Sequence, residues 1–150
     1  MVELQDVTRE NWLDCSRLKL AVHQKEMVAP NVYSIAEASF ESHFRPRAIY
    51  ADQELVGFLM YCVETDPPDP TLFWLFRFMI DANHQGKGYG TAALRLALVE
   101  IKDAGAHRIR TMHKPSNTVA SRLYQRFGFV AIGTLDDGDV ELELQVETAG

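Results

Sequence analysis

The chain has 150 residues, of which 47% are hydrophobic, and its formal net charge is −6. A chain of this length folds as one domain and buries a sizeable core without disulfides or a structural metal, while the negative charge argues against general affinity for nucleic acid and favours a cationic substrate or partner. The first residues lack the basic and apolar segments of a signal peptide, and the longest apolar runs, 55–63 and 71–76, are too short to span a bilayer. We therefore expect one cytoplasmic domain, 1–150, without a membrane attachment.

The first half of the chain predicts a strand, two helices and three further strands. We expect the strands at 2–7, 47–51, 54–65 and 71–80, and the helices at 10–20 and about 35–43. Ser34 and Glu37 have the spacing of a capping box, which places the start of the second helix just after Ser34. The two longest strands are almost continuously apolar, which predicts that both of their faces are covered. We expect them to pair as a central hairpin across a loop formed by the Pro-rich segment 66–70.

The second half predicts alternating helices and strands. Apolar residues recur at helical spacing from Leu94 to Ile101, so the clearest helix covers 90–104 and ends at Gly105. It is followed by a strand at 107–113, a helix capped by Ser116 that runs to about 127, and a closing hairpin of strands at 129–134 and 140–146. The order β-α-α-β-β-β-α-β-α-β-β predicts an α/β (α+β mixed) fold, with a mixed, mostly antiparallel sheet of about seven strands and about four helices on both faces.

Three alternate glycines, Gly86, Gly88 and Gly90, lie between the strand at 71–80 and the clearest helix. Glycine permits a tight turn and a close approach of the backbone to a ligand, and the free N–H groups of a first helical turn attract an anion. The loop therefore suits a pyrophosphate, although such glycines also form plain tight turns. The spacing matches neither the P-loop nor the dinucleotide-binding GxGxxG pattern. Four cations lie in the loop or after it, namely Lys87, Lys114, Arg122 and Arg126. Each would either contact further phosphate or be an ordinary solvated charge.

Two motifs make the sequence similar to the GNAT superfamily of N-acetyltransferases. Gln85-Gly86-Lys87-Gly88-Tyr89-Gly90 matches the family's Q/R-x-x-G-x-G/A motif, between the fourth strand and the third helix. The family's N…A…LY…GF signature is matched by Asn117, Ala120, Leu123-Tyr124 and Phe127-Gly128-Phe129. The two motifs in this order are highly specific. The predicted element order is also that of the family, so the resemblance covers the whole chain.

Shorter segments resemble bacterial spermine/spermidine N-acetyltransferases in particular, namely 28–31, 33–38 and 77–81. They imply a polyamine such as spermidine or spermine as the acceptor of the acetyl group. Alternative acceptors are an aminoglycoside, an amino acid or a protein N-terminus. An alternative of another class is a non-catalytic acetyl-CoA-binding module that regulates a partner.

The resemblance implies that acetyl-CoA enters a gap between the fourth and fifth strands, where the amine attacks it directly. Its pyrophosphate would lie on the N–H groups of the glycine loop, and backbone groups of the fourth strand would face the pantetheine and the thioester. The implied cofactor-binding residues are Met79, Ile80, Gln85, Gly86, Lys87, Gly88, Tyr89, Gly90 and Asn117. Asn117 is equally well explained as a polar residue at a helix start. The resemblance implies no metal, and dimers are common in the family.

Tyr124 is the catalytic residue that the resemblance implies. A phenol has a pKa near ~10, so it is protonated at neutral pH and can donate a proton to the departing thiolate. The alternative is an aromatic side chain that packs on the core beside Leu123 and Phe127. Cys15 and Cys62 have neither CxxC spacing nor a base at motif distance, so we expect two reduced thiols and no covalent acyl-enzyme.

The sequence does not identify the general base. Candidates are Glu26, Glu37, Glu41, Glu64 and His113. Each has a structural alternative, since Glu37 would close the capping box and Glu41 would be a solvated helix charge. Where some relatives have an acidic residue in the fourth strand, this chain has Phe76 and Arg77. A chain of water molecules is a further candidate for taking the proton from the amine. We also expect Glu26, Glu37 and Glu41 to line the acceptor side, where the resemblance places the first two helices.

Overall fold

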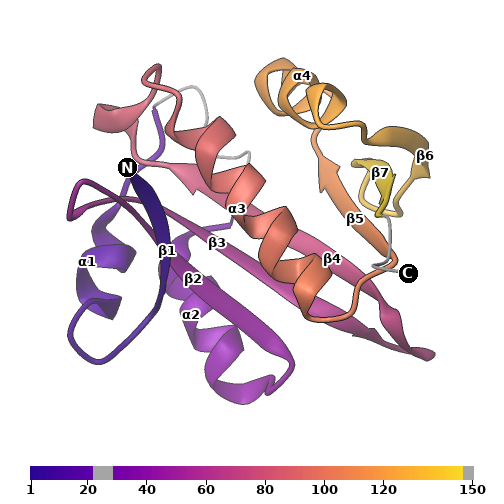
Figure 1. The fold of residues 1–150 in the computed structure, drawn as a ribbon, viewed down its shortest axis with the longest axis horizontal. Coiled ribbons are helices and arrows are strands. Elements are labelled where there is room, and N and C mark those ends of the chain that lie inside the picture. The colour runs from indigo at the N-terminus through magenta and orange to yellow at the C-terminus, as the bar shows by residue number, and fades with distance from the viewer. Residues whose placement is uncertain (22–28, 147–150) are drawn as a thin grey trace.

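A seven-stranded sheet organises the described residues, 1–21 and 29–146, of the computed structural model (Figure 1). Its strands lie in the order β1-β2-β3-β4-β5-β7-β6. Their bounds are β1 (Val2–Asp6), β2 (Phe44–Ala51), β3 (Glu54–Thr65), β4 (Pro68–Ile80), β5 (Arg108–His113), β6 (Val130–Thr134) and β7 (Val140–Gln145). β4 and β5 run parallel, whereas the other neighbours are antiparallel. The predicted mixed sheet and its central β3–β4 hairpin are confirmed.

Helices cover both faces of the sheet, as predicted. Their bounds are α1 (Trp12–Arg17), α2 (Asn31–Phe40), α3 (Tyr89–Asp103) and α4 (Thr118–Arg126). On one face, Leu94 and Ile101 of α3 and Tyr124 of α4 belong to the same buried cluster. On the other face, Cys15 of α1 packs with Phe58 of β3 in a second cluster. Figure 1 shows α3 lying across the strands, with α4 beyond it above β5.

The predicted starts of two helices are wrong. α2 begins at Asn31, whose Nδ2 donates a 2.9 Å hydrogen bond to the carbonyl oxygen of Cys15 and so anchors the helix to α1. Ser34 therefore lies inside the helix, fully buried, and caps nothing. The cap of α4 is Asn117 rather than Ser116, because Asn117 Oδ1 accepts a 3.1 Å hydrogen bond from the Ala120 N–H.

Three other predicted boundaries also differ. α1 is much shorter than the expected 10–20. β2 includes Pro46, which lies beyond the last residue that β1 covers, Arg47, so its missing N–H costs no hydrogen bond to β1. β4 begins at Pro68, and the first position of a strand tolerates proline. The Pro-rich segment is therefore only partly a loop.

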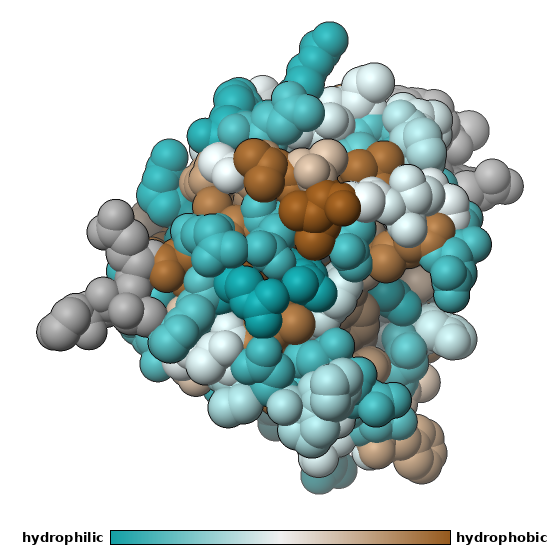
Figure 2. All heavy atoms as spheres, turned by 90° about the vertical axis from the view of Figure 1, so that its right-hand side faces the viewer, coloured by the Kyte–Doolittle hydropathy of each residue, from teal (hydrophilic) through white to brown (hydrophobic). Residues whose placement is uncertain are grey.

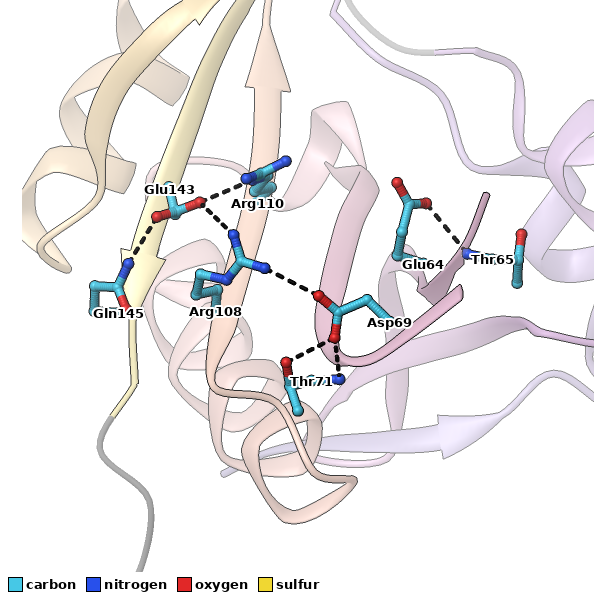
Figure 3. A network of polar contacts seen from close by, with 8 residues as sticks. All are labelled: Glu64, Thr65, Asp69, Thr71, Arg108, Arg110, Glu143 and Gln145. Atoms are coloured by element: carbon cyan, nitrogen blue, oxygen red, sulfur yellow. Dashed lines mark hydrogen bonds and ion pairs between the residues drawn. The ribbon is translucent and has the colours of Figure 1, made fainter. Parts of the chain in front are cut away.

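Charged side chains join β4, β5 and β7 at one end of the sheet (Figure 3). Arg108 lies 3.0 Å from Asp69 Oδ2 and 3.7 Å from Glu143 Oε2. Arg110 Nε donates to the same oxygen of Glu143 at 2.8 Å, and Asp69 accepts a 2.7 Å hydrogen bond from the Thr71 hydroxyl. This network holds the three strands together where β4 and β5 are paired.

β6 forms one edge of the sheet in the described part of the chain. Two of its apolar side chains are exposed, Val130 by 62% and Ile132 by 45%. Figure 2 looks onto the side on which β6 and β7 lie, and it shows apolar residues gathered among polar ones. The homodimer expected from the sequence stays a prediction.

Candidate active site

The pairing of β4 and β5 stops halfway along β4. The parallel ladder ends at Leu75 and Thr111, although β4 continues to Ile80 and β5 to His113. The register between β3 and β4 shifts at the same point and leaves Phe76 as a bulge. The resemblance implied this gap between the fourth and fifth strands, and two cavities lie at it.

The first cavity has a volume of about 500 Å³, and we call it the glycine-loop cavity. Its walls come from the end of β4, the glycine loop, the first turn of α3, and α4. The lining includes Phe78, Met79, Ile80, Gln85, Gly86, Gly88, Tyr89, Gly90, Thr91, Asn117, Tyr124 and Arg126. Nearly all the residues predicted to bind the cofactor therefore surround one space.

The conformation of the glycine loop requires glycine at two positions. Gly86 and Gly88 have φ values of +78° and +83°, and a Cβ on either residue would meet no described atom within 4 Å. The open side of the loop is therefore free for a ligand. Gln85 Nε2 closes the loop onto β4 through a 2.9 Å hydrogen bond to the Ile80 carbonyl oxygen.

Asp81 holds the entry to the loop. Its carboxylate accepts hydrogen bonds from the backbone N–H groups of Lys19 at 2.9 Å and Asn83 at 3.2 Å, and lies 3.1 Å from His84 Nδ1. His84 Nε2 lies 3.1 Å from Glu54 on the neighbouring strand β3. Burial raises the pKa of Asp81, but these hydrogen bonds outweigh it and bring the pKa below its usual value.

The first turn of α3 borders the glycine-loop cavity. Gly88 caps the helix in the left-handed conformation, and no side chain caps it. Tyr89, Gly90 and Thr91 line the cavity with backbone N–H groups that have no partner within the helix. Arg126 of α4 adds a positive charge beside this turn, where its Nη2 donates a 3.4 Å hydrogen bond to Thr91 Oγ1. This arrangement fits a pyrophosphate.

The other predicted phosphate contacts are not gathered at this cavity. Lys87 points into solvent from the loop, and Arg122 lies on the exposed part of α4. Neither residue lines the described cavities. Lys114 lines the second cavity instead.

The second cavity has a volume of about 450 Å³ and lies between the ends of β4 and β5 and the β6–β7 turn. It shares Phe78, Asn117, Ala120 and Tyr124 with the glycine-loop cavity. We call it the acceptor cavity, because it reaches the same tyrosine from the other side. Besides Tyr124, its charged or titratable lining residues are Arg77, His113, Lys114, Asp137 and Asp139.

Tyr124 stands at the junction of the two cavities. Its side chain is only 5% exposed, belongs to the core, and packs edge-on against Phe129 with 5.4 Å between ring centres. Burial raises the pKa of its hydroxyl, which a hydrogen bond with Thr111 partly opposes. Tyr124 therefore meets both descriptions considered above: it packs in the core and also reaches the cavities.

The predicted acidic residues are not gathered at the acceptor cavity. Glu37 forms a 3.2 Å salt bridge with Arg77 Nη2. Glu41 is largely exposed near His43. Glu64 lies at the opposite end of the sheet, beside Thr65 (Figure 3). Glu26 lies outside the described residues.

Sequence reasoning missed Asp137 and Asp139. Both belong to a segment interpreted only as a hairpin turn. The β7 strand inserts between β5 and β6, and Val140 pairs with His113, which brings the turn next to the end of β5. The run of acidic residues was the only local signal, and its position depends on this long-range pairing.

Neither cysteine lies in surroundings that would make its thiol a nucleophile. Burial, with Asp14 adding to it, raises the pKa of Cys15 to about 11, and burial together with Glu64 raises the pKa of Cys62 to about 12. Both thiols are free. At neutral pH both are therefore protonated, in accord with direct transfer without an acyl-enzyme.

Among residues 1–21 and 29–146, none of the helices has the length and the apolar composition of a membrane span.

Comparisons with known proteins agree with this geometry. The model of the acetyltransferase (GNAT) family matches residues 4–129. A spermine/spermidine N(1)-acetyltransferase of Bacillus subtilis (strain 168) is 31% identical over 139 residues, which cover 90% of this chain and 91% of that protein. An aminoglycoside N(6')-acetyltransferase type 1 of Klebsiella pneumoniae is 35% identical over 82 residues, or 53% of this chain and 40% of that protein.

Solved structures show the same fold. The aminoglycoside acetyltransferase AAC(6')-Ib, in complex with coenzyme A and kanamycin, superposes with a TM-score of 0.81 at 21% identity, covering 97% of this chain and 95% of that one. The ribosomal-protein-S18-alanine N-acetyltransferase of Escherichia coli superposes with a TM-score of 0.75 at 17% identity, covering 100% and 97%. At sequence identities this low, the structural similarity shows that the fold is shared and nothing more.

Proposed function

Because the chain belongs to the GNAT family of acetyltransferases and transfers the acetyl group of acetyl-CoA to an amine, we propose that its acceptor is a polyamine such as spermidine or spermine. The relative from Bacillus subtilis, similar along nearly its whole length, bears the name of such an enzyme. The aminoglycoside enzymes match only about half of the chain.

The glycine-loop cavity would hold acetyl-CoA. The N–H groups of Tyr89, Gly90 and Thr91 and the charge of Arg126 would bind the pyrophosphate, which the open glycines allow to approach the backbone. Met79 and Ile80 belong to the part of β4 that β5 no longer covers. Their backbone groups on that side would bind the pantetheine and polarise the acetyl carbonyl, where a well-placed N–H contributes ~3 kcal/mol.

Tyr124 would donate a proton to the leaving thiolate. Tyr124 lines both cavities, so a thiol bound in one cavity and an amine bound in the other would meet beside it. Its raised pKa keeps the hydroxyl protonated at neutral pH. Asn117 would contact the cofactor through its amide NH₂, while its Oδ1 caps α4.

The charge of the acceptor cavity is the observation that carries the polyamine proposal. Asp137 and Asp139 line the cavity, and Arg77 is neutralised by Glu37. Lys114 is the remaining cation of the lining, so the carboxylates outnumber the unpaired positive charges. An acceptor with a second ammonium group would be attracted by this wall while its first ammonium group reacts near Tyr124.

A double variant tests this proposal. Asp137→Asn together with Asp139→Asn keeps the turn's acceptor groups but removes both charges. We expect the KM for spermidine to rise roughly tenfold or more, equivalent to ~1.4 kcal/mol, whereas the KM for a monoamine changes less. Asp136→Asn, at an exposed position outside the lining, is the control. An equal effect on both amines, or none, would contradict the proposal.

A further inference from the structure

Besides Tyr124, His113 is a buried titratable side chain of the acceptor cavity. It ends β5, is 7% exposed, and lines the cavity together with Tyr124 and Arg77. Such a position takes an imidazole out of bulk water and leaves it at the wall of the cavity, within reach of an amine that binds there. The proposed roles of the glycine loop and Tyr124 leave this residue unused.

The backbone fixes which nitrogen of His113 can accept a proton. Nδ1 lies 2.8 Å from the carbonyl oxygen of Lys114. A carbonyl oxygen only accepts hydrogen bonds, so Nδ1 carries the hydrogen and the neutral ring has its lone pair on Nε2. Within residues 1–21 and 29–146, Nε2 has no hydrogen-bond partner.

The geometry points to His113 as the general base of the reaction, an inference that rests on the proposed acetyl transfer to an amine in this cavity. Nε2 takes a proton from the acceptor ammonium, which frees the nitrogen lone pair for attack on the acetyl carbon. The C–N bond forms and the C–S bond breaks, Tyr124 protonates the departing sulfur, and the second proton lost by the nitrogen restores the phenol of Tyr124. His113 then releases its proton to solvent, so one proton is released per acetyl group transferred.

The charged groups around His113 suit this role. Lys114 follows it in the chain, Arg77 faces the cavity from β4, and Asp137 and Asp139 face it from the β6–β7 turn. Because Glu37 pairs with Arg77, the two aspartates can stabilise the imidazolium that forms after proton transfer. A carboxylate is in general a weaker base than an imidazole toward an ammonium at neutral pH.

The candidate bases with carboxylate side chains that the structure describes are less suited than His113 to take the proton of the amine. Glu37 is held in its salt bridge to Arg77 and borders neither described cavity. Glu41 is exposed directly after the end of α2. Glu64 lies at the end of the sheet opposite the acceptor cavity. His113 is the candidate that both borders the acceptor cavity and presents an unpaired nitrogen.

The test compares His113→Gln and His113→Ala with wild type over a pH series. Glutamine fills similar space but takes up no proton at neutral pH. We expect kcat/KM for the amine to fall roughly a hundred- to ten-thousand-fold, with the affinity for acetyl-CoA unchanged. The wild-type rate should fall as the pH is lowered and the base becomes protonated, and this limb should be absent in His113→Gln. Added imidazole should restore part of the activity of His113→Ala.

His107→Gln is the matched control, because His107 lies just before the other end of β5 and is exposed. Its kcat/KM should equal that of wild type. The inference is overturned if His113→Gln keeps the wild-type rate and pH profile, or if its activity is lost together with a lowered Tm and imidazole restores nothing. If wild type acetylates an amine other than a polyamine, the proposed acceptor fails, and the same variants assayed with that amine still decide the role of His113.

Discussion

Leu75 and Thr111 form the last pair of the parallel β4–β5 ladder, and Thr111 Oγ1 also donates a 2.7 Å hydrogen bond to the Leu75 carbonyl oxygen. Beyond this pair the strands separate and the two cavities begin. On the paired side, Arg108 joins Asp69 of β4 to Glu143 of β7. The sheet therefore has a closed end held by charges and an open end at which the two cavities lie.

Gly88→Val is expected to weaken coenzyme A binding by a hundredfold or more. Gly88 has φ +83°, and a branched Cβ would enter the space that the loop leaves for a ligand. The left-handed conformation itself costs a non-glycine residue ~1–2 kcal/mol. Calorimetry measures the affinity, and Gly138→Val, at φ +92° in the β6–β7 turn, controls for that cost. Unchanged affinity in Gly88→Val would remove the loop from the site.

Tyr124→Phe is expected to lower kcat by roughly a hundred- to ten-thousand-fold with a nearly constant KM for acetyl-CoA. The donor must be protonated, so activity falls as the pH rises through its pKa, which burial places above the usual value. That high-pH limb should be absent in the phenylalanine variant. Tyr61→Phe is the matched control, since it removes a buried hydroxyl bound to Glu100 away from both cavities. A purely structural Tyr124 would change Tm and leave kcat intact.

The sequence predicted the cofactor side better than the acceptor side. The glycine loop and the start of α3 are contiguous in the chain, so their geometry follows from local preferences such as the positive φ of Gly88. The start of α2 at Asn31 depends instead on a hydrogen bond to Cys15, and the placement of Asp137 depends on the insertion of β7 beside β5. Contacts between distant segments leave no periodic signal in the sequence.

Glu37→Gln is expected to raise the KM for a polyamine by up to about tenfold, equivalent to ~1.4 kcal/mol. The substitution removes the charge that neutralises Arg77, so a positive guanidinium faces the cationic acceptor. Acetyl-CoA affinity should not change, and added salt should reduce the effect. Glu41→Gln, at a largely exposed side chain of the same segment, is the control. A change in Tm without a change in KM would assign Glu37 a structural role only.

Asp81→Asn is expected to lower Tm by about 2–10 °C at pH 7, because a charged acceptor of three hydrogen bonds contributes ~1–3 kcal/mol. The pKa of Asp81 is lowered in the folded protein. Its contribution is therefore fully present above the unfolded pKa of ~3.9 and is lost as the pH falls through the folded pKa. Thermal melts of both proteins from pH 7 to pH 3 should converge at the acidic end, whereas a constant gap would exclude the charge as its cause.

The rate of thiol release from acetyl-CoA, measured with a panel of amines at equal concentrations, decides whether the acceptor is a polyamine. The panel contains spermine, spermidine, kanamycin, single amino acids and a peptide with a free N-terminus. We predict that kcat/KM is highest for spermine or spermidine and at least roughly tenfold lower for the others, a difference of ~1.4 kcal/mol in transition-state binding. A higher kcat/KM for kanamycin or the peptide would contradict the polyamine assignment, and no thiol release with any amine would contradict catalysis itself.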